Sequence, residues 1–418
     1  MSFKLDTRKI MDNGKLKIKW AGSQMKVLEK IKQRFAKDKP LKGITLGACL
    51  HVTAETANLM LTLQSGGAKL ALCASNPLST QDAVAESLNK NFDIPTFAKK
   101  GEDRKTYYKH LNKVLDFHPQ ITMDDGADLI TLLHTERKSQ LKEIVGSSEE
   151  TTTGVIRLKA MKEKGDLKIP VMAVNDSQTK HLFDNRYGTG QSTIDGIIRA
   201  TNVLLAGKNF VVCGYGWCGR GISEKARGMG AHVTVTEVDP VRALQAVMDG
   251  FEVTSLSVAC QKADIIVTAT GNKNVLGRDL FKLLKNGVIL CNAGHFNVEF
   301  DYENLVKIAK QITKVREFLE ELVMPDNKKV FVLGEGRLIN LVAAEGHPPD
   351  VMDLSFANQA LAAEFFVKNK GKLKNDIYTI PEKQDIEIAR LKLESMGISI
   401  DQLTKEQKHY LSSWNEGT

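Results

Sequence analysis

A glycine-rich turn in the middle of the chain has the spacing of a dinucleotide-binding loop. Gly214, Gly216 and Gly219 follow the apolar stretch NFVVC and precede a segment with helical periodicity. Such glycines permit a tight turn, a close approach to a pyrophosphate and close packing of helix on strand. Glu237, at the end of the next apolar stretch, is placed to accept both ribose hydroxyls and would repel a 2′-phosphate. The pattern therefore predicts NAD rather than NADP.

Upstream of this turn, polar side chains gather where apolar stretches end. Ligands of open α/β sheets bind at the carboxyl ends of the strands. Each polar cluster alone also fits a helix cap, a turn or a solvated surface. Together they hold the acids, the histidine and the lysine that acid–base chemistry on a hydroxyl-rich ligand needs. The clusters are HVTAE at 51–55, DDG at 124–126, EETTTG at 149–154, ND at 175–176 and KHLFDN at 180–185.

Two later loops each add a histidine. His295, followed by Phe296, comes after the apolar stretch GVILC, and His347 comes after KVFVLGEG and Asn340. An isolated histidine is usually a structural or surface residue. Because both loops follow expected strands of the cofactor-binding half, we expect them beside the nicotinamide.

The elements that must position these residues alternate between strand and helix. Residues 20–37 and 351–370 have helical periodicity. The alternation of short apolar runs with amphipathic segments is typical of parallel sheets covered by helices. The expected strands lie at 43–51, 68–75, 121–125 and 170–176, and then at 209–213, 232–236, 263–270, 287–294 and 329–336.

We therefore predict an α/β protein with two doubly wound Rossmann-like domains joined by a hinge, followed by a short C-terminal tail. Residues 1–184, completed by about 346–375, are expected to bind substrate, and residues 185–345 to bind NAD. Asn185 precedes the first helix of the cofactor half, where a closing hinge would fall. Residues 376–418 are expected to form the tail.

The composition excludes several classes of protein. Of 418 residues, 42% are hydrophobic and 26% charged, as in an ordinary globular protein. No apolar run is long enough for a membrane span and no apolar signal core opens the chain, so we expect no membrane association and a cytoplasmic location. The net charge of +8 is dispersed, which disfavours a nucleic-acid partner. The six cysteines lack metal-ligand spacing, so no metal is expected.

Motifs along nearly the whole chain, from about residue 20 to the tail, resemble those of the adenosylhomocysteinases, with SEETTTG and NDSQTKHLFDN the most specific. The resemblance implies reversible hydrolysis of S-adenosyl-L-homocysteine to adenosine and L-homocysteine, with one tightly bound NAD per subunit. In that family the 3′-hydroxyl is oxidised transiently, which acidifies the 4′-hydrogen. The thiol then leaves, water adds and the ketone is reduced. The other matching motifs, in chain order, are HVTAETA, LSTQDAVA, DDGADL, GYGWCGRG, NAGHF, GRLINL and GHPPDVMDLSFANQ.

The resemblance also implies roles for single residues. Lys180 and Asp184 fall near the 3′-hydroxyl, where burial would help the lysine to lose its proton. Asp125 and His51 serve the 4′-proton and the 5′ side, and the sequence does not decide which takes the 4′-proton. Catalytic and substrate contacts further include Glu150 at the ribose, His295 with Phe296 as a gate, and Thr53, Glu55 and His347 at the base. The implied NAD contacts are Thr151, Thr152, Thr153, Asn185, Gly214, Gly216, Gly219, Glu237, Thr270 and Asn340.

Four features depart from the family pattern. Thr189 and Ser75 stand where many relatives have cysteine, so a thiol near the 3′ carbon is missing. Glu345 stands where many have methionine, so a hypoxanthine nucleoside, in S-inosyl-L-homocysteine, is the alternative substrate. The chain ends at SSWNEGT without the Lys- and Tyr-containing tail of many relatives, and we expect a homotetramer or a homodimer. A net NAD-dependent dehydrogenase and a catalytically silent NAD-binding regulator are the less favoured alternatives.

Overall fold

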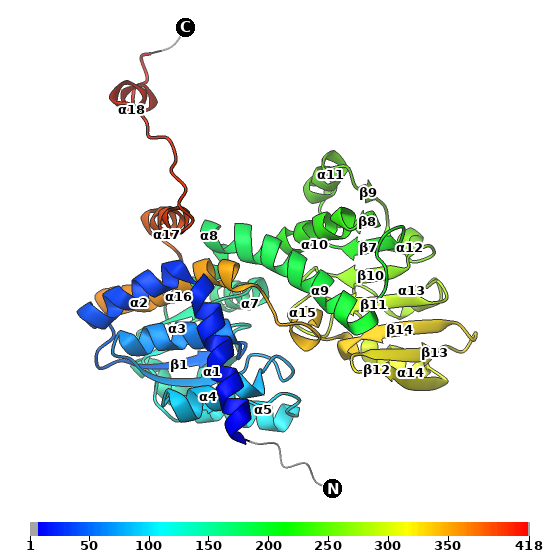
Figure 1. Ribbon diagram of the computed structural model, residues 1–418, viewed down its shortest axis with the longest axis horizontal. Coiled ribbons are helices and arrows are strands. Elements are labelled where there is room, and N and C mark those ends of the chain that lie inside the picture. The colour runs from blue at the N-terminus through cyan, green and yellow to red at the C-terminus, as the bar shows by residue number, and fades with distance from the viewer. Residues whose placement is uncertain (1–6, 417–418) are drawn as a thin grey trace.

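Two β-sheets organise the computed structural model, which describes residues 7–416 (Figure 1). The first sheet is entirely parallel, with the strand order β15-β6-β5-β4-β1-β2-β3. Its strands are β1 (Thr45–Cys49), β2 (Lys69–Cys73), β3 (Thr96–Phe97), β4 (Ile121–Asp124), β5 (Gly146–Glu149), β6 (Val171–Ala173) and β15 (Ile377–Thr379). The helices of this domain are α1 (Thr7–Gln24), α2 (Lys26–Asp38), α3 (Ala54–Ser65), α4 (Asp82–Asn91), α5 (Arg104–Leu115), α6 (Asp128–Thr135), α7 (Thr152–Glu163), α16 (Pro349–Lys368) and α17 (Glu382–Ser395).

The second sheet has the strand order β12-β13-β14-β11-β10-β7-β8-β9. Its part from β14 to β9 is parallel and has the doubly wound order of nucleotide-binding folds, with ligands expected where the order reverses beside β7. Its strands are β7 (Asn209–Cys213), β8 (His232–Thr236), β9 (Glu252–Val253), β10 (Ile265–Thr268), β11 (Val288–Asn292), β12 (Gln311–Arg316), β13 (Leu319–Val323) and β14 (Lys329–Leu333). Its helices are α9 (Thr189–Thr201), α10 (Trp217–Gly228), α11 (Pro240–Met248), α12 (Leu256–Ala259), α13 (Arg278–Phe281), α14 (Tyr302–Ile308) and α15 (Ile339–Val342).

The predicted two-sheet α/β class is confirmed. The burial of the strands explains why the sequence pattern could predict it. A parallel strand covered on both faces is a continuous apolar run, as in LALC of β2 and IIVT of β10, whose residues are all buried. β5 is a strand that this pattern does not predict, because its buried sequence is GSSE. Several of its polar groups form hydrogen bonds instead: the Ser148 hydroxyl donates to Gln359 at 2.6 Å, and Oε1 of Glu149 accepts from the backbone N–H of Gly126 at 2.8 Å.

The helical pattern at 20–37 corresponds to two helices, since α1 ends at Gln24 and α2 begins at Lys26. The buried carboxylate of Asp353, on α16, accepts from the backbone N–H groups of Val27 and Leu28 at 3.1 and 2.8 Å. Asp353 therefore caps α2 from a distant part of the chain.

The C-terminal segment differs from the predicted tail. β15 pairs with β6 at the edge of the first sheet, and α17 packs against α2 and α16. The tail predicted from residue 376 therefore begins only after α17. Beyond it, α18 (Lys405–Ser412) extends away from both domains (Figure 1). Within the part of the chain that the structure describes, no helix has the length and apolarity to cross a bilayer.

Candidate active site

A cavity of about 730 Å³ lies between the two domains and is lined by both. Asp124 pairs in register with Cys49 on one side and Glu149 on the other, so β1, β4 and β5 end at one level. The loops after these strands therefore bring their side chains to one edge of the sheet, where ligands of such folds bind. The structure brings together every residue predicted for catalysis or substrate binding: His51, Thr53, Glu55, Asp125, Glu150, Lys180, Asp184, His295 and His347.

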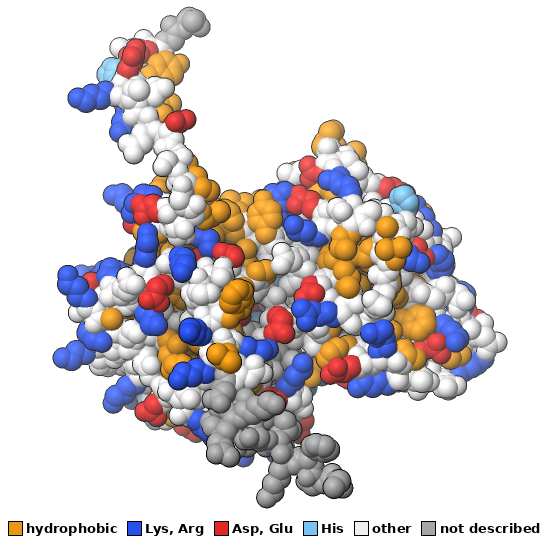
Figure 2. Space-filling view, viewed as in Figure 1, with side chains coloured by type: hydrophobic (Ala, Val, Ile, Leu, Met, Phe, Trp, Pro, Cys, Tyr) orange, Lys and Arg blue, Asp and Glu red, His pale blue; other side chains and the backbone are white. Residues whose placement is uncertain are grey.

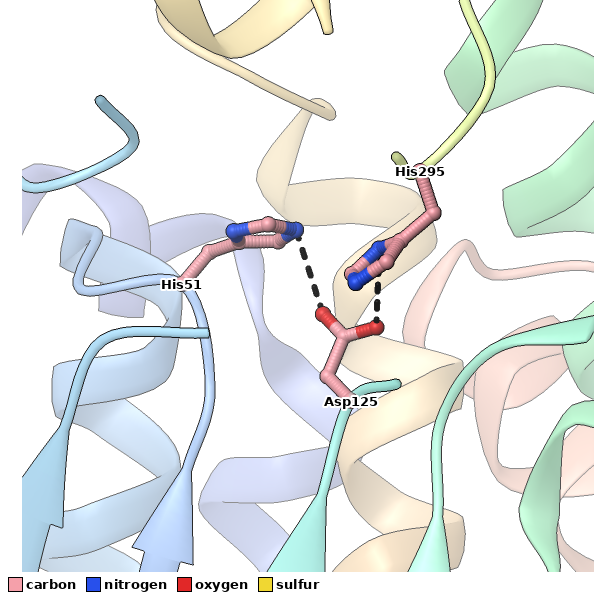
Figure 3. A group of neighbouring side chains, drawn as sticks. All are labelled: His51, Asp125 and His295. Atoms are coloured by element: carbon pink, nitrogen blue, oxygen red, sulfur yellow. Dashed lines mark ion pairs between the residues drawn. The ribbon is translucent and has the colours of Figure 1, made fainter. Parts of the chain in front are cut away.

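Within the cavity, Asp125 lies between two histidines from different domains (Figure 3). Its Oδ2 is 3.1 Å from Nε2 of His51, in the first domain, and its Oδ1 is 3.6 Å from Nδ1 of His295, in the second. The other ring nitrogen of His51 lies 2.8 Å from the Ser79 hydroxyl and 3.1 Å from that of Ser75. His51 and Asp125 can thus exchange a proton directly, and His295 lies just beyond hydrogen-bond distance of the same carboxylate.

The protonation of His51 suits a proton acceptor. Burial lowers the pKa of His51 to about 4, although the neighbouring Asp125 carboxylate opposes the shift. His51 is therefore a neutral imidazole near neutral pH, able to take a proton next to a carboxylate that would stabilise the resulting cation. Ligand atoms of His51, Asp125 and His295 also lie within 4.8 Å of one another, a spacing that a metal would accept, so the expectation of no metal rests on the sequence alone.

In the same cavity, Lys180 lies in a buried polar cluster, near enough to Asp125 for that carboxylate to act on its charge. Its Nζ donates to Oδ1 of Asn185 at 2.7 Å and lies 3.4 Å from Asp184 and 3.6 Å from Glu150. Nδ1 of His347 approaches Asp184 at 3.0 Å. This cluster is suited to hold two adjacent ribose hydroxyls.

The sequence led us to expect that burial helps Lys180 to lose its proton, but the net shift of its pKa in the cluster is in the opposite direction. Burial does favour the neutral amine, but Asp184 and Glu150 outweigh it, and the pKa of Lys180 is raised. For Asp184, burial is likewise outweighed, by Lys180 and His347, and its pKa is lowered. Burial raises the pKa of Glu150 to about 8, against the influence of Lys180. Without substrate, Lys180 and Asp184 therefore form a charged pair.

A π-helical segment places Asp184 and Asn185. The short helix α8 (Gln178–Lys180) continues directly into the π-helical segment η3 (His181–Gly188) and then into α9. The wider turn brings Asn185 back to Lys180, and Nδ2 of Asn185 also donates to Asn175 at 3.0 Å. Such π-segments are frequent at functional sites. No sequence pattern predicted this π-helical segment.

The second domain offers a cradle that fits a dinucleotide. Gly214 has a φ of +98°, and a Cβ on Gly216 would meet no atom closer than 3.9 Å, which leaves room above the turn. Glu237 accepts from the backbone N–H of Tyr215 at 2.7 Å, which joins the carboxylate predicted to bind the ribose to the glycine loop. Oδ1 of Asn340 is buried without a partner among the described residues, as expected of an atom that awaits a ligand.

The predicted NAD contacts line the cavity with one exception. Gly219 does not reach it, because it lies under the turn, where a Cβ would be 1.9 Å from the carbonyl oxygen of Gly214. This is the packing role that the fingerprint assigns to the third glycine. The nine that line the cavity are Thr151, Thr152, Thr153, Asn185, Gly214, Gly216, Glu237, Thr270 and Asn340.

Several site residues were missed. Glu299 accepts from the backbone N–H groups of Thr270 and Gly271 at 2.9 and 2.8 Å and so fixes a wall of the cofactor site. Nε2 of Gln359 donates to Glu150 at 2.6 Å. Cys218, which lies within the glycine-rich turn, lines the cavity, so a thiol is present although position 189 lacks one.

At the base end, the Glu55 carboxyl is buried and Glu345 is not part of the cavity wall. Burial raises the pKa of Glu55. Glu345 instead pairs with Lys17 at 3.1 Å, and its side chain is 60% exposed. Glu345 is therefore not placed to hydrogen-bond a purine in the cavity, although its charge contributes to the raised pKa of Glu55.

Comparisons with known proteins agree with this geometry. Residues 185–346 match the family described as "S-adenosyl-L-homocysteine hydrolase, NAD binding domain", and residues 2–144 match "S-adenosyl-L-homocysteine hydrolase". The chain is 58% identical to the adenosylhomocysteinase of Thermosynechococcus vestitus, over 97% of this chain and 94% of the relative. It is 55% identical to that of Saccharolobus solfataricus over the full length of both.

A relative with a different name is equally similar. The S-inosyl-L-homocysteine hydrolase of Methanocaldococcus jannaschii is 56% identical over 97% of both chains. Among solved structures, a dipicolinate synthase chain from Bacillus halodurans is 13% identical, with a TM-score of 0.48 over 79% of this chain and 98% of that one.

Proposed function

Because this chain belongs to the S-adenosyl-L-homocysteine hydrolase family, we propose that its cavity hydrolyses the thioether bond of S-adenosyl-L-homocysteine, reversibly, to adenosine and L-homocysteine. The observation that carries this proposal is the meeting, in one cavity, of an NAD cradle with two proton-transfer groups. One group is Lys180 with Asp184, and the other is His51 with Asp125. A dehydrogenase with net turnover would need only the first.

The ribose end of the reaction belongs to the Lys180 cluster. Bound NAD⁺ supplies reversible oxidation at the 3′ carbon. Glu150 and Asp184 accept hydrogen bonds from the ribose hydroxyls, and Lys180 receives the 3′-hydroxyl proton. Because Lys180 is charged beside Asp184 in the free enzyme, Nζ must first release a proton to solvent. The ribose hydroxyls favour this loss by competing for Asp184 and Glu150, whose charges hold the proton on Nζ.

The elimination belongs to the His51–Asp125–His295 group. His51, neutral because its pKa is about 4, and the adjacent Asp125 act as a coupled pair at the 4′ and 5′ positions. One takes the 4′-proton, and the pair returns a proton to the leaving sulfur. His295, with Phe296 packed edge-on at 4.7 Å, closes this end from the second domain. Closure keeps bulk water from the unsaturated ketone until the thiol has left.

Adenosine is the nucleoside that we propose first. The carboxyl oxygens of Glu55 accept from a 6-amino group, and Glu345, the residue that suggested a different base, pairs with Lys17 outside the cavity. Inosine is the second candidate, for two reasons. Burial favours a protonated Glu55, which would donate to a 6-oxo group, and a relative named for the inosyl substrate is 56% identical.

The assembly and domain limits complete the proposal. We place residues 1–184 with 346–395 in the substrate domain and residues 185–345 in the NAD domain of a cytoplasmic enzyme.

We propose a homotetramer or homodimer, with one tightly held NAD per subunit. Exposed apolar side chains on the extended tail, including Leu411 and the 96% exposed Trp414, and on α11 support self-association (Figure 2). Light scattering would give the mass, which Trp414→Ser should reduce.

The central test uses purified protein without added NAD. Homocysteine is mixed with adenosine or, in parallel, with inosine, and thioether formation is followed by mass spectrometry. We expect product from adenosine and no net release of NADH. Faster product formation from inosine would make inosine the preferred nucleoside in place of adenosine. Stoichiometric release of NADH would indicate a dehydrogenase. If neither nucleoside reacts even after NAD is added, the proposal fails.

A further inference from the structure

The helix that carries Lys180 receives its N-terminal cap from the C-terminal segment. Ser177, the residue before α8, makes no capping bond to the helix with its own side chain. Instead the carboxylate of Asp385, on α17, accepts from the backbone N–H groups of Gln178 and Thr179 at 2.7 and 2.9 Å. It also accepts from the hydroxyls of Ser177, at 2.7 Å, and Thr179. A carboxylate at this place satisfies N–H groups that the helix leaves free and opposes the helix dipole.

The surroundings of Asp385 make this a fixed contact. Asp385 is 8% exposed, and α17 packs directly on α8 and α16. Nδ2 of Asn358, on α16, donates to the same two hydroxyls, of Ser177 at 3.1 Å and Thr179 at 2.8 Å. Although burial opposes ionisation, hydrogen bonds from Thr179 and Ser177 outweigh it and hold the pKa of Asp385 below its ordinary value. The cap is therefore a charged group at neutral pH.

The cap acts directly on the catalytic segment. Thr179, which Asp385 holds by two bonds, is the residue before Lys180, and Asp184 and Asn185 follow within the next turns of the continuous helix. Lys180 reaches Asp184 and Asn185 at 3.4 and 2.7 Å, distances that a shift of about 1 Å at the helix start would disrupt. Displacements of this size cost enzymes about 100-fold in rate.

We propose that Asp385 is a positioning residue for the 3′-oxidation, so that the C-terminal segment belongs to the catalytic apparatus. The inference rests on the proposed function, since it assumes that Lys180 receives the 3′-hydroxyl proton. It predicts that loss of the cap slows the first oxidation of bound nucleoside more than it weakens nucleoside or NAD binding.

The chain offers a matched control. Asp353 is also buried, also accepts from two backbone N–H groups at the start of a helix, and also contacts α17, through Lys392 at 3.0 Å. It caps α2, which carries no residue of the site. Asp353→Asn therefore alters a buried cap whose own bonds lead to α2 and Lys392 and not to the segment of Lys180.

The test compares Asp385→Ala, Asp385→Asn and Asp353→Asn as holoenzymes. Adenosine is mixed with excess enzyme, and the rise of NADH absorbance gives the rate of 3′-oxidation. NAD content, the Kd for adenosine and the Tm are measured in parallel. We expect Asp385→Ala to slow the oxidation about 10-fold to 100-fold. Asp385→Asn, which keeps the oxygen that accepts from Thr179 and loses the bond to Gln178, should recover part of the rate.

The control decides between positioning and stability. Asp353→Asn should lower the Tm to a similar degree and leave the oxidation rate unchanged. The inference would be overturned if Asp385→Asn oxidised nucleoside at the same rate as Asp353→Asn. Asp385→Ala, if it folds, would then have that same rate. A parent enzyme that forms no NADH from any nucleoside would instead reject the proposed function, and the inference with it.

Discussion

Replacing Gly221 by alanine should force the π-helical segment η3 away from α10 while leaving both sheets intact. Gly221 lies on α10, against the π-helical segment η3. A Cβ at this position would be 1.8 Å from the carbonyl oxygen of Arg186 and 2.7 Å from its carbon. Since real Cβ contacts below 3.0 Å are essentially absent, η3 and α10 must separate by roughly 1.2 Å. The obstacle is backbone, which no side-chain rotation can relieve.

The separation has two consequences. Overpacking of this kind costs about 1–3 kcal/mol of stability. Arg186 directly follows Asp184 and Asn185, so the same shift moves both away from Lys180. A misplacement near 1 Å corresponds to about 100-fold in kcat. We expect Gly221→Ala to lower the Tm by several degrees and kcat by about 100-fold, measured by calorimetry and by thioether synthesis.

Gly228, the last residue of the same helix, provides the control. A Cβ there would meet nothing within 4 Å. Alanine should therefore stabilise the protein by about 0.5–1 kcal/mol, the usual gain for replacing glycine in a helix. If Gly221→Ala matched Gly228→Ala in Tm and kcat, the tight crossing of α10 and η3 would not exist in solution, and the argument from it would be refuted.

Three further predictions follow from the site. Lys180→Ala should abolish single-turnover NADH formation while the purified protein keeps its NAD; normal NADH formation would remove Lys180 from its role. Glu237→Ala should weaken NAD binding about 10-fold to 100-fold, because charged hydrogen bonds contribute about 1.5–3 kcal/mol; full retention of NAD through dialysis would contradict this. Folding lowers the pKa of His51 from 6.5 to about 4, so between these pH values the unfolded state binds a proton that the folded state does not. The free energy of unfolding should therefore fall as the pH decreases from 6.5 to about 4. Urea unfolding of His51→Gln should show a smaller loss of stability across that window, and an unchanged slope would count against a buried neutral His51.

Features carried by local sequence were predictable. The glycine fingerprint and Glu237 lie within one strand–turn–helix–strand unit, so their spacing alone reports their geometry. The polar clusters were found because each follows an apolar strand, and parallel strands end at one edge of the sheet. The resemblance to a family added the individual roles. It implied that burial would help Lys180 to lose its proton. Burial does act in that direction, but Asp184 and Glu150 outweigh it and raise the pKa of Lys180.

Features that depend on distant parts of the chain were not predictable. Gln359 reaches Glu150, and Asp385 reaches Thr179, across more than 200 positions of sequence, and both have the appearance of ordinary helix residues. β5 was missed because its buried side chains are polar and form hydrogen bonds, so it lacks the apolar run by which the other strands were predicted. The close approach at Gly221 is a property of two helix backbones, which no side-chain pattern records.

The position of Asp125 between His51 and His295 has a consequence for any attempt to divide this protein. The first domain supplies His51 and Asp125, and the second supplies His295 and the cradle for NAD. A fragment comprising the second domain alone would keep the glycine loop and Glu237 but lose the first domain's part of the cavity wall, including Thr151 to Thr153. A fragment comprising the first domain would lack the glycine loop altogether. Two such fragments, expressed separately, should each be inert and should recover activity only by reassembling, which makes the chain a natural template for a split reporter.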